Sequence, residues 1–162
     1  MIDEGVSAVV LAILLVAGVI ASSQLFSTSR VSEPFSELGI LGPRMKIGDY
    51  PRTVLINETF KLYLYIGNHE GRIVYYRVYV KTGSRDTLIN GTVPADAPVV
   101  AFYEAILLNG ENKTIPIELS LQKPMVNCRL IFEMWILNPE TLEFNYHGRW
   151  CQLWLNVTSP RI

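Results

Sequence analysis

The side chains best suited to acid–base or metal chemistry are few and scattered in this 162-residue chain. The two histidines are His69 and His147, and His69-Glu70 lies in a segment that predicts a solvated turn between strands. Asp49 directly precedes Tyr50-Pro51, a pattern that favours a structural turn. The sequence has no phosphate-binding loop, nucleophile elbow or paired-carboxylate spacing. We therefore predict no catalytic, cofactor-binding or metal-binding residue.

Two cysteines, Cys128 and Cys151, lie in segments that alternate apolar and polar residues, as strands do. If Asn138–Thr141 closes a tight hairpin between them, the numbers of opposed residues sum to 279, which sets the cysteines opposite each other. We predict a disulfide there, worth about 3 kcal/mol. The alternative is two buried free thiols, and a break near His147-Gly148 would shift the register. Without a CxxC motif or a His/Cys cluster, zinc is not expected.

Four Asn-x-Thr sequences have the pattern of N-glycosylation sites. They begin at Asn57, Asn90, Asn112 and Asn156. Together with the cysteines, they predict that the domain faces an extracytoplasmic, N-glycosylating space. The alternative is ordinary turn chemistry, since Asn90-Gly91 is also a hairpin-turn signal.

Gly5 to Phe26 is 22 residues without a charge or a proline. As a helix it spans about 33 Å, enough to cross a bilayer core of roughly 30 Å. We predict one transmembrane helix over residues 5–26, after a tail of residues 1–4. Arg30 follows the helix and no basic residue precedes it, which by the positive-inside tendency favours a cytoplasmic domain. We give the sequons and cysteines more weight, and the missing basic n-region distinguishes the segment from an ordinary secretory signal peptide.

Small residues recur at four-residue spacing along this helix, which lets helix backbones approach closely in lipid. They are Ala8 and Ala12, Ala17 and Ala21, and Gly18 and Ser22. The pattern predicts self-association through the helix or membership of a larger membrane complex. The alternative is that Ala and Gly are simply common in spanning helices.

The rest of the chain predicts one β domain. Residues 27–33 form a polar tether, and residues 34–51 are rich in Pro and Gly and predict an extended, ordered coil. About six to eight short strands follow without an amphipathic helix, which is typical of an immunoglobulin-like β-sandwich. Pro98–Leu108 fits a strand or a short helix, and Pro116 implies an edge strand or a bulge. We assign the sandwich to residues 34–159.

Alternation in the first two strand candidates places tyrosines and cations on an outer face. The residues are Tyr63, Tyr65, Tyr75, Tyr79, Arg77 and Lys81. Such a face is typical of a partner-binding surface, because tyrosine combines a large contact area with a hydrogen-bonding tip. The alternative is that the coil of residues 34–51 covers it. Trp150 and Trp154 form either a second contact surface or part of a two-sided core.

Basic and acidic residues nearly balance, at 14 and 15. A net charge of −1 argues against a nucleic-acid partner.

Several motifs follow one another through the β region. They are Pro34–Pro43 (PFSELGILGP), Asp49-Tyr50-Pro51, Gly67–Gly71 (GNHEG), Tyr75–Val78 (YYRV) and Trp150–Val157 (WCQLWLNV). Their order resembles the C-terminal region of an archaeal membrane protein family known as domain of unknown function 1616. The resemblance implies an extracytoplasmic β-sandwich similar to adhesion modules, often behind several membrane helices, and no established activity. This chain departs from the family in having one helix.

The start of the helix, Glu4–Val10 (EGVSAVV), resembles that of archaeal type IV pilin-like proteins, although their basic leader is missing here. The leading hypothesis is a non-catalytic, membrane-anchored cell-surface module that binds other envelope proteins or glycans. The alternative is a pilin-like subunit of an extracellular filament, assembled through the helix. A third hypothesis is an enzyme or an accessory subunit of one, with His69 and Asp49 as the candidate residues.

Overall fold

The computed structural model describes residues 4–27 and 33–160, and the chain divides into two units, residues 1–33 and 34–162. The first unit contains helix α1 (Glu4–Ser27), whose side chains are exposed over residues 5–23. Gly5–Ser23 is apolar and long enough to cross a membrane, a property that signal sequences share. The predicted helix is therefore present, whereas residues 1–3 of the tail and residues 28–32 of the tether lie outside the described residues.

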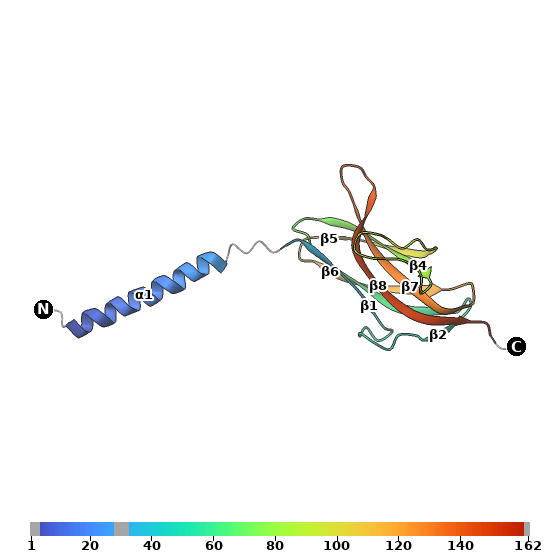
Figure 1. Cartoon of the computed structure of the whole chain (residues 1–162), viewed down its shortest axis with the longest axis horizontal. Coiled ribbons are helices and arrows are strands. Elements are labelled where there is room, and N and C mark those ends of the chain that lie inside the picture. Colours follow the sequence, from blue (N-terminus) through green and yellow to red (C-terminus); the bar gives the residue numbers. More distant parts are fainter. Residues whose placement is uncertain (1–3, 28–32, 161–162) are drawn as a thin grey trace. The chain divides into compact units, whose positions relative to one another are not determined.

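The second unit is built from eight strands in two sheets (Figure 1). The strands are β1 (Phe35–Leu41), β2 (Thr53–Leu55), β3 (Thr59–His69), β4 (Val74–Gly83), β5 (Val99–Leu107), β6 (Asn112–Ser120), β7 (Met125–Leu137) and β8 (Phe144–Thr158). One sheet has the order β1-β3-β6, and the other has the order β2-β8-β7-β4-β5. All neighbours are antiparallel except β2, which runs parallel to β8.

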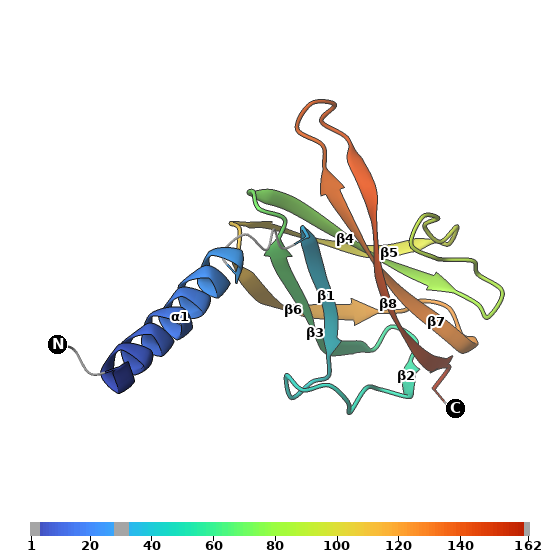
Figure 2. The ribbon, with the colours of Figure 1, turned by 60° about the vertical axis from the view of Figure 1, so that its left-hand side comes forward.

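The connectivity is that of an immunoglobulin-like sandwich. The chain passes from one sheet to the other between β1 and β2, β2 and β3, β3 and β4, β5 and β6, and β6 and β7. These passages place strands distant in sequence side by side (Figure 2). The β7–β8 hairpin is the longest in the domain, and its tip extends beyond the two layers (Figures 1 and 2). The predicted fold class is confirmed.

The core lies between the two sheets and follows directly from the period-two pattern of the strands. On β3 the inward residues Leu62, Leu64 and Ile66 are fully buried, as are Tyr76 and Val78 on β4. In the layer of the three-stranded sheet, the β3 residues are joined by Ile117 and Leu119 of β6. In the layer of the five-stranded sheet, the β4 residues are joined by Leu130, Phe132 and Met134 of β7 and by Leu155 and Val157 of β8. The alternate residues on the same strands form the two outer faces.

The structure corrects one of the predictions for individual segments and confirms another. Residues 35–41 of the predicted coil form β1 instead, because their backbone pairs with β3 along its whole length. Pro98–Leu108 forms a strand, β5. Pro116 lies on β6, which is an edge of the three-stranded sheet, so the edge position predicted from the missing N–H is confirmed.

The predicted disulfide is wrong. Cys128 lies opposite Leu155 and Cys151 opposite Phe132, and both cysteines are free thiols. A register offset of four residues separates them by about 13 Å along the strands, whereas a disulfide needs Cα atoms within about 7 Å.

Two local features cause this offset between the cysteines. The hairpin loop is longer than a tight turn, since Leu137 pairs with Phe144. His147 and Gly148 then form a bulge, because Met134 pairs with Arg149 while Trp135 pairs with Tyr146. Gly148 has a φ of 70° and packs so closely against Gly91 that a Cβ would lie 2.3 Å from the Gly91 carbonyl oxygen. Only glycine fits at this bulge.

Candidate interaction site

The predicted tyrosine face is split between the two sheets. Tyr63 and Tyr65 project from β3 on the outside of the three-stranded sheet, whereas Tyr75 and Tyr79 project from β4 on the outside of the five-stranded sheet. The prediction of one continuous surface is wrong because the β3–β4 connection crosses the sandwich and is not a hairpin within one sheet.

The tyrosines of β3 make local contacts on their own sheet. The Tyr65 hydroxyl donates to Glu37 Oε2 at 2.8 Å, and the Tyr65 side chain lies over Gly39 of β1. The Lys61 ammonium lies 5.1 Å from the centre of the Tyr63 ring. This face therefore offers two half-buried tyrosines beside exposed charges.

Lys81 is not available to a partner. Its ammonium donates to the Ala95 carbonyl at 2.6 Å and lies 2.8 Å from Glu133 Oε2, and the Glu133 side chain is fully buried. The Ala95 N–H also donates to the Glu133 carboxylate, at 2.5 Å. Residues 84–98, and not the predicted coil of residues 34–51, cover this part of the outer face. Lys81 and Glu133 thus attach the segment to the sheet.

An aromatic patch remains at the uncovered end of the five-stranded sheet. We define it by Tyr75, Arg77, Tyr79, Phe102, Glu104 and Phe144, which come from strands β4, β5 and β8. Register explains the grouping within β4 and β5, since Arg77 lies opposite Glu104 and Tyr79 opposite Phe102. Phe144 joins from the start of β8, where its ring meets Tyr75 edge-on with centroids 5.3 Å apart.

Arg77 is the centre of the aromatic patch. Its guanidinium lies 3.9 Å from the Phe144 ring centre and 5.2 Å from that of Phe102, within cation–π range of both. Its Nη2 lies 2.5 Å from Glu104 Oε1 and its Nε donates to the same oxygen at 2.7 Å. The hydrogen bond from Arg77 holds the pKa of the Glu104 carboxyl below its usual value. The ion pair and rings therefore order one another.

The patch is accessible, and its rings pack against one another and against the neighbouring strand. Phe102 is 55% exposed, and the other rings are half-buried. Tyr79 also packs edge-on against Trp135, with centroids 5.6 Å apart, which supports it from the neighbouring strand β7. Ordered aromatic rings around an arginine lose little conformational entropy on binding, so this geometry suits recognition of a partner.

A second aromatic cluster lies further along the same outer face. The guanidinium of Arg129 is 5.5 Å from the Trp150 ring centre and 5.7 Å from that of Trp154. It also donates to the Thr87 carbonyl at 2.6 Å and to the Gln152 side chain. Arg129 itself is buried, so this cluster mainly fastens residues 84–98, although Trp154 is 44% exposed.

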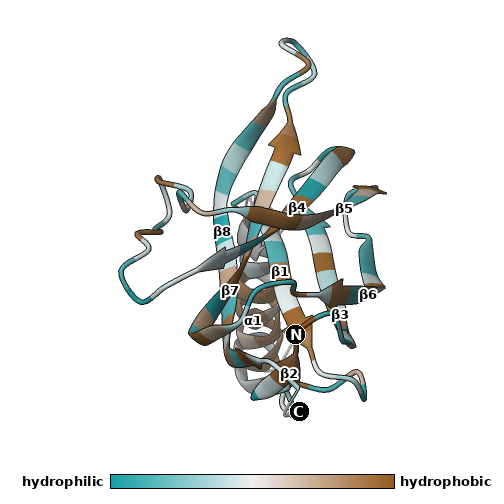
Figure 3. Ribbon diagram, turned by 90° about the vertical axis from the view of Figure 1, so that its right-hand side faces the viewer, coloured by the Kyte–Doolittle hydropathy of each residue, from teal (hydrophilic) through white to brown (hydrophobic). Residues whose placement is uncertain are grey.

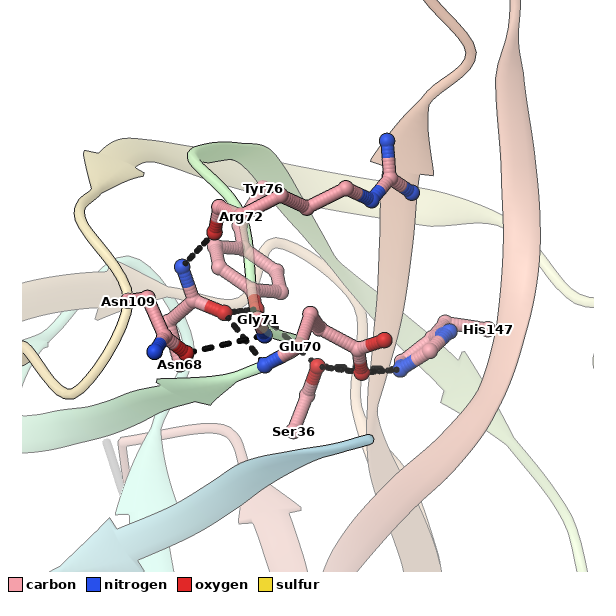
Figure 4. A network of polar contacts seen from close by, with 8 residues as sticks. All are labelled: Ser36, Asn68, Glu70, Gly71, Arg72, Tyr76, Asn109 and His147. Carbon is pink, nitrogen blue, oxygen red and sulfur yellow. Dashed lines mark hydrogen bonds and ion pairs between the residues drawn. The ribbon is translucent and has the colours of Figure 1, made fainter. Parts of the chain in front are cut away.

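A buried polar network connects β1, the β3–β4 connection and the β8 bulge (Figure 4). His147 Nε2 lies 3.0 Å from both Ser36 Oγ and Glu70 Oε1, and Ser36 Oγ donates to the same Glu70 oxygen at 2.6 Å. The Tyr76 hydroxyl contacts Ser36 Oγ at 2.9 Å and donates to Asn68 Oδ1 at 3.1 Å. Burial raises the pKa of the Tyr76 hydroxyl.

This network contains a serine, a histidine and a carboxylate, but its geometry differs from a hydrolytic triad. In a triad the carboxylate holds Nδ1 while Nε2 faces the serine, whereas here Glu70 and Ser36 share Nε2. Ser36 is buried, and its hydroxyl donates a hydrogen bond to Glu70. The sequence interpretation of Glu70 as a solvated turn residue is therefore wrong, because its side chain is 11% exposed and contacts Ser36 and His147.

The other residues considered for chemistry lie apart. His69 stacks on Phe35, with ring centroids 4.5 Å apart, and lies 3.6 Å from the Glu37 carboxylate. Asp49 pairs with Arg44 in the loop after β1. Within residues 4–27 and 33–160, no group of three or more His, Cys, Asp or Glu side chains is placed to hold a metal ion.

The four sequons differ in how they present their asparagines. Asn57, Asn90 and Asn112 are exposed, and Asn90 Oδ1 accepts from the Thr92 and Val93 N–H groups. Asn156 is half-buried between β2 and β7, and its Oδ1 accepts from the Asn127 N–H at 2.8 Å. Glycosylation itself stays a prediction.

The small residues of α1 do not form one stripe. Ala8 and Ala17 are nine residues apart, so they face opposite sides of a helix with about 100° per residue. Ser22 Oγ donates to the Gly18 carbonyl in the same helix. Packing through Ala8, Ala12, Ala17, Gly18, Ala21 and Ser22 stays a prediction.

Several solved structures are similar to this chain over most of its length. The CARDB domain of the PF1109 protein from Pyrococcus furiosus, in complex with di-metal ions, is 13% identical, covers 78% of this chain and 90% of its own, and has a TM-score of 0.47. A β-glucosidase from Listeria innocua in complex with glucose is 14% identical, covers 76% and 16%, and has a TM-score of 0.46. Alpha-2-macroglobulin from E. coli is 14% identical, covers 76% and 7%, and has a TM-score of 0.44. We draw no functional argument from them.

None of the curated proteins matches this chain. The similarity to pilin-like proteins and the archaeal origin stay predictions from the sequence. One family model, described as domain of unknown function (DUF1616), matches residues 29–156. This range contains strands β1 to β7 in full and all of β8 except its last two residues. The chain therefore belongs to the DUF1616 family.

Proposed function

We propose that this protein is a non-catalytic, membrane-anchored interaction module that binds proteins or glycans of the cell envelope through its aromatic patch. The helix over Gly5–Ser23 would hold the sandwich at the membrane, and the four sequons favour an extracytoplasmic domain. The observation that carries the proposal is Arg77, held between Phe144 and Phe102 and paired with Glu104 on an accessible face.

The composition of the patch supports this role. Tyrosine, phenylalanine and arginine are enriched at protein interfaces, and a few such residues carry most of the binding energy. The patch also displays both charge signs within one ion pair, so it can orient a partner as well as contact it. The buried histidine network supports a non-catalytic role, because its serine proton already bonds Glu70.

The test is capture of partners by the full-length chain from solubilised native membranes, with a glycan array in parallel. The patch variant is R77Q/F144S, and the matched control is Y63S/Y65S, which removes two half-buried rings from the other sheet. Loss of two central contacts predicts at least a tenfold fall in bound partner, since each tenfold step corresponds to about 1.4 kcal/mol. The control should stay within about twofold of the unmodified chain.

Circular dichroism checks that both variants keep the β fold. Equal retention of partner by the patch variant and the control would contradict the patch. Signal on the glycan array alone would assign the ligand to glycans, and capture of a protein alone would assign it to an envelope protein.

A further inference from the structure

Strand β5 is an edge of the five-stranded sheet, and it differs from the other three edges of the sandwich. Within residues 33–160, β5 pairs with β4 only. After a bulge opposite Val80 and Lys81, residues 101–107 continue in regular register without a proline, lysine or arginine. Figure 3 shows β5 as a largely hydrophobic strand.

The other edges carry features that discourage pairing with a second chain. β6 contains Pro116 and the charged Lys113 and Glu118. β2 is only three residues long, and β1 carries Glu37 beside His69. On β5 the one charged residue, Glu104, is already paired with Arg77.

Two apolar side chains flank Glu104 on the outer face of β5. Phe102 is 55% exposed and Ile106 is 64% exposed. A second copy of β5, antiparallel and centred on Glu104, places Phe102 of each chain opposite Ile106 of the other. This register also pairs the whole regular stretch, because 101 then meets 107 and 103 meets 105. Opposed apolar residues in such pairs stabilise antiparallel sheets.

The charges permit this arrangement. Two glutamates lie opposite each other at the centre, which alone would be destabilising. In each copy, however, Glu104 is paired with Arg77 at 2.5 Å, so the opposed carboxylates are both neutralised by an ion pair.

We infer that β5 is a self-association surface, through which two copies of this chain join their five-stranded sheets by antiparallel pairing. One strand pair buries less surface than a stable soluble dimer, so the association depends on confinement of both copies to one membrane. The surface shares Phe102 and Glu104 with the aromatic patch, whereas Ile106 belongs to the β5 surface alone and Phe144 to the patch alone.

Disulfide trapping in phosphatidylcholine vesicles tests the register with the full-length chain. The two native cysteines are interior and burial raises the pKa of both thiols, so an added exposed cysteine reacts first. Under mild oxidation, E104C should form a covalent dimer because the substituted residues face each other. I106C alone should not, since the two copies of residue 106 are separated by four residues of register, about 13 Å.

The collision control is I47C, whose native side chain is 87% exposed in the loop after β1. We expect at least tenfold more dimer from E104C than from I106C or I47C. Equal yields from the three variants, or no dimer from E104C, would overturn the inference. A mixture of F102C and I106C chains should cross-link between the two kinds of chain, and failure to do so would exclude the register.

A disruption experiment separates this surface from the helix and the patch. I106K should lower the dimer fraction in vesicles at least fivefold, measured by single-molecule photobleaching, while I47K leaves it unchanged. A dimer fraction that survives I106K would place self-association elsewhere, in α1 above all. The Phe144→Ser variant should lose partner binding but keep the E104C cross-link, so the two proposals fail separately.

Discussion

Removal of one partner of the Lys81–Glu133 ion pair should destabilise the sandwich strongly. In Lys81→Met the fully buried Glu133 carboxylate loses the Lys81 ammonium at 2.8 Å. It keeps the hydrogen bond from the Ala95 N–H and a longer one, of 3.3 Å, from Trp135 Nε1. Breaking a buried pair in this way costs about 3–5 kcal/mol. For a domain of this size, about 4 °C per kcal/mol, the melting temperature should fall by about 12–20 °C.

The assay is unfolding of the full-length chain in detergent, followed by tryptophan fluorescence. All three tryptophans lie on β7 and β8, so the signal reports on the sandwich and not on α1. The double variant Lys81→Met/Glu133→Leu should recover most of the loss, because well-packed apolar residues can replace a buried ion pair at little cost. A single variant that loses less than about 1 kcal/mol, or a double variant less stable than the single, would refute the assignment of a buried, mutually dependent pair.

Four further predictions concern the interior and the sequons. Tyr76→Phe should lower the free energy of unfolding in urea by only about 1 kcal/mol, because Ser36 and Asn68 each retain another hydrogen-bond partner; a loss above 3 kcal/mol would show that the hydroxyl organises the network. A thiol reagent should label both cysteines without prior reduction, but only after unfolding, and two unreactive sulfurs in the unfolded chain would indicate a disulfide. Because burial raises the pKa of Cys151 to about 12, folding favours its protonated form, so stability should fall as pH rises from about 9 to about 12, and Cys151→Ala should remove that part of the decrease. In glycosylated protein, Asn90→Gln should lower the intact mass by one glycan while Asn156→Gln should not, because the Asn156 side chain is held by Asn127; a mass loss with Asn156→Gln would contradict this.

Much of the fold depends on the residue pattern within single segments, so it could be predicted from the sequence. Leu62, Leu64 and Ile66 alternate with polar residues, and a strand with a buried face requires that alternation whatever its partner. The apolar run of α1 and the edge position of Pro116 also depend on one segment's own chemistry. These features sufficed for the fold class.

The candidate site depended on pairings between segments that the sequence alone does not order. Which sheet a strand joins decided that Tyr63 and Tyr75 face opposite sides, and the closeness of Arg77 to Phe102 and Phe144 required three strands to meet. Gly148 moved the cysteines apart by admitting a bulge whose backbone packs on Gly91, a residue 57 positions away in the chain. Residue type and spacing thus determined the strands and the helix, because hydrophobic periodicity is a property of each segment. Only the tertiary structure decided the aromatic patch, the buried network and the register, because each arises where distant segments satisfy one another's packing and hydrogen bonds.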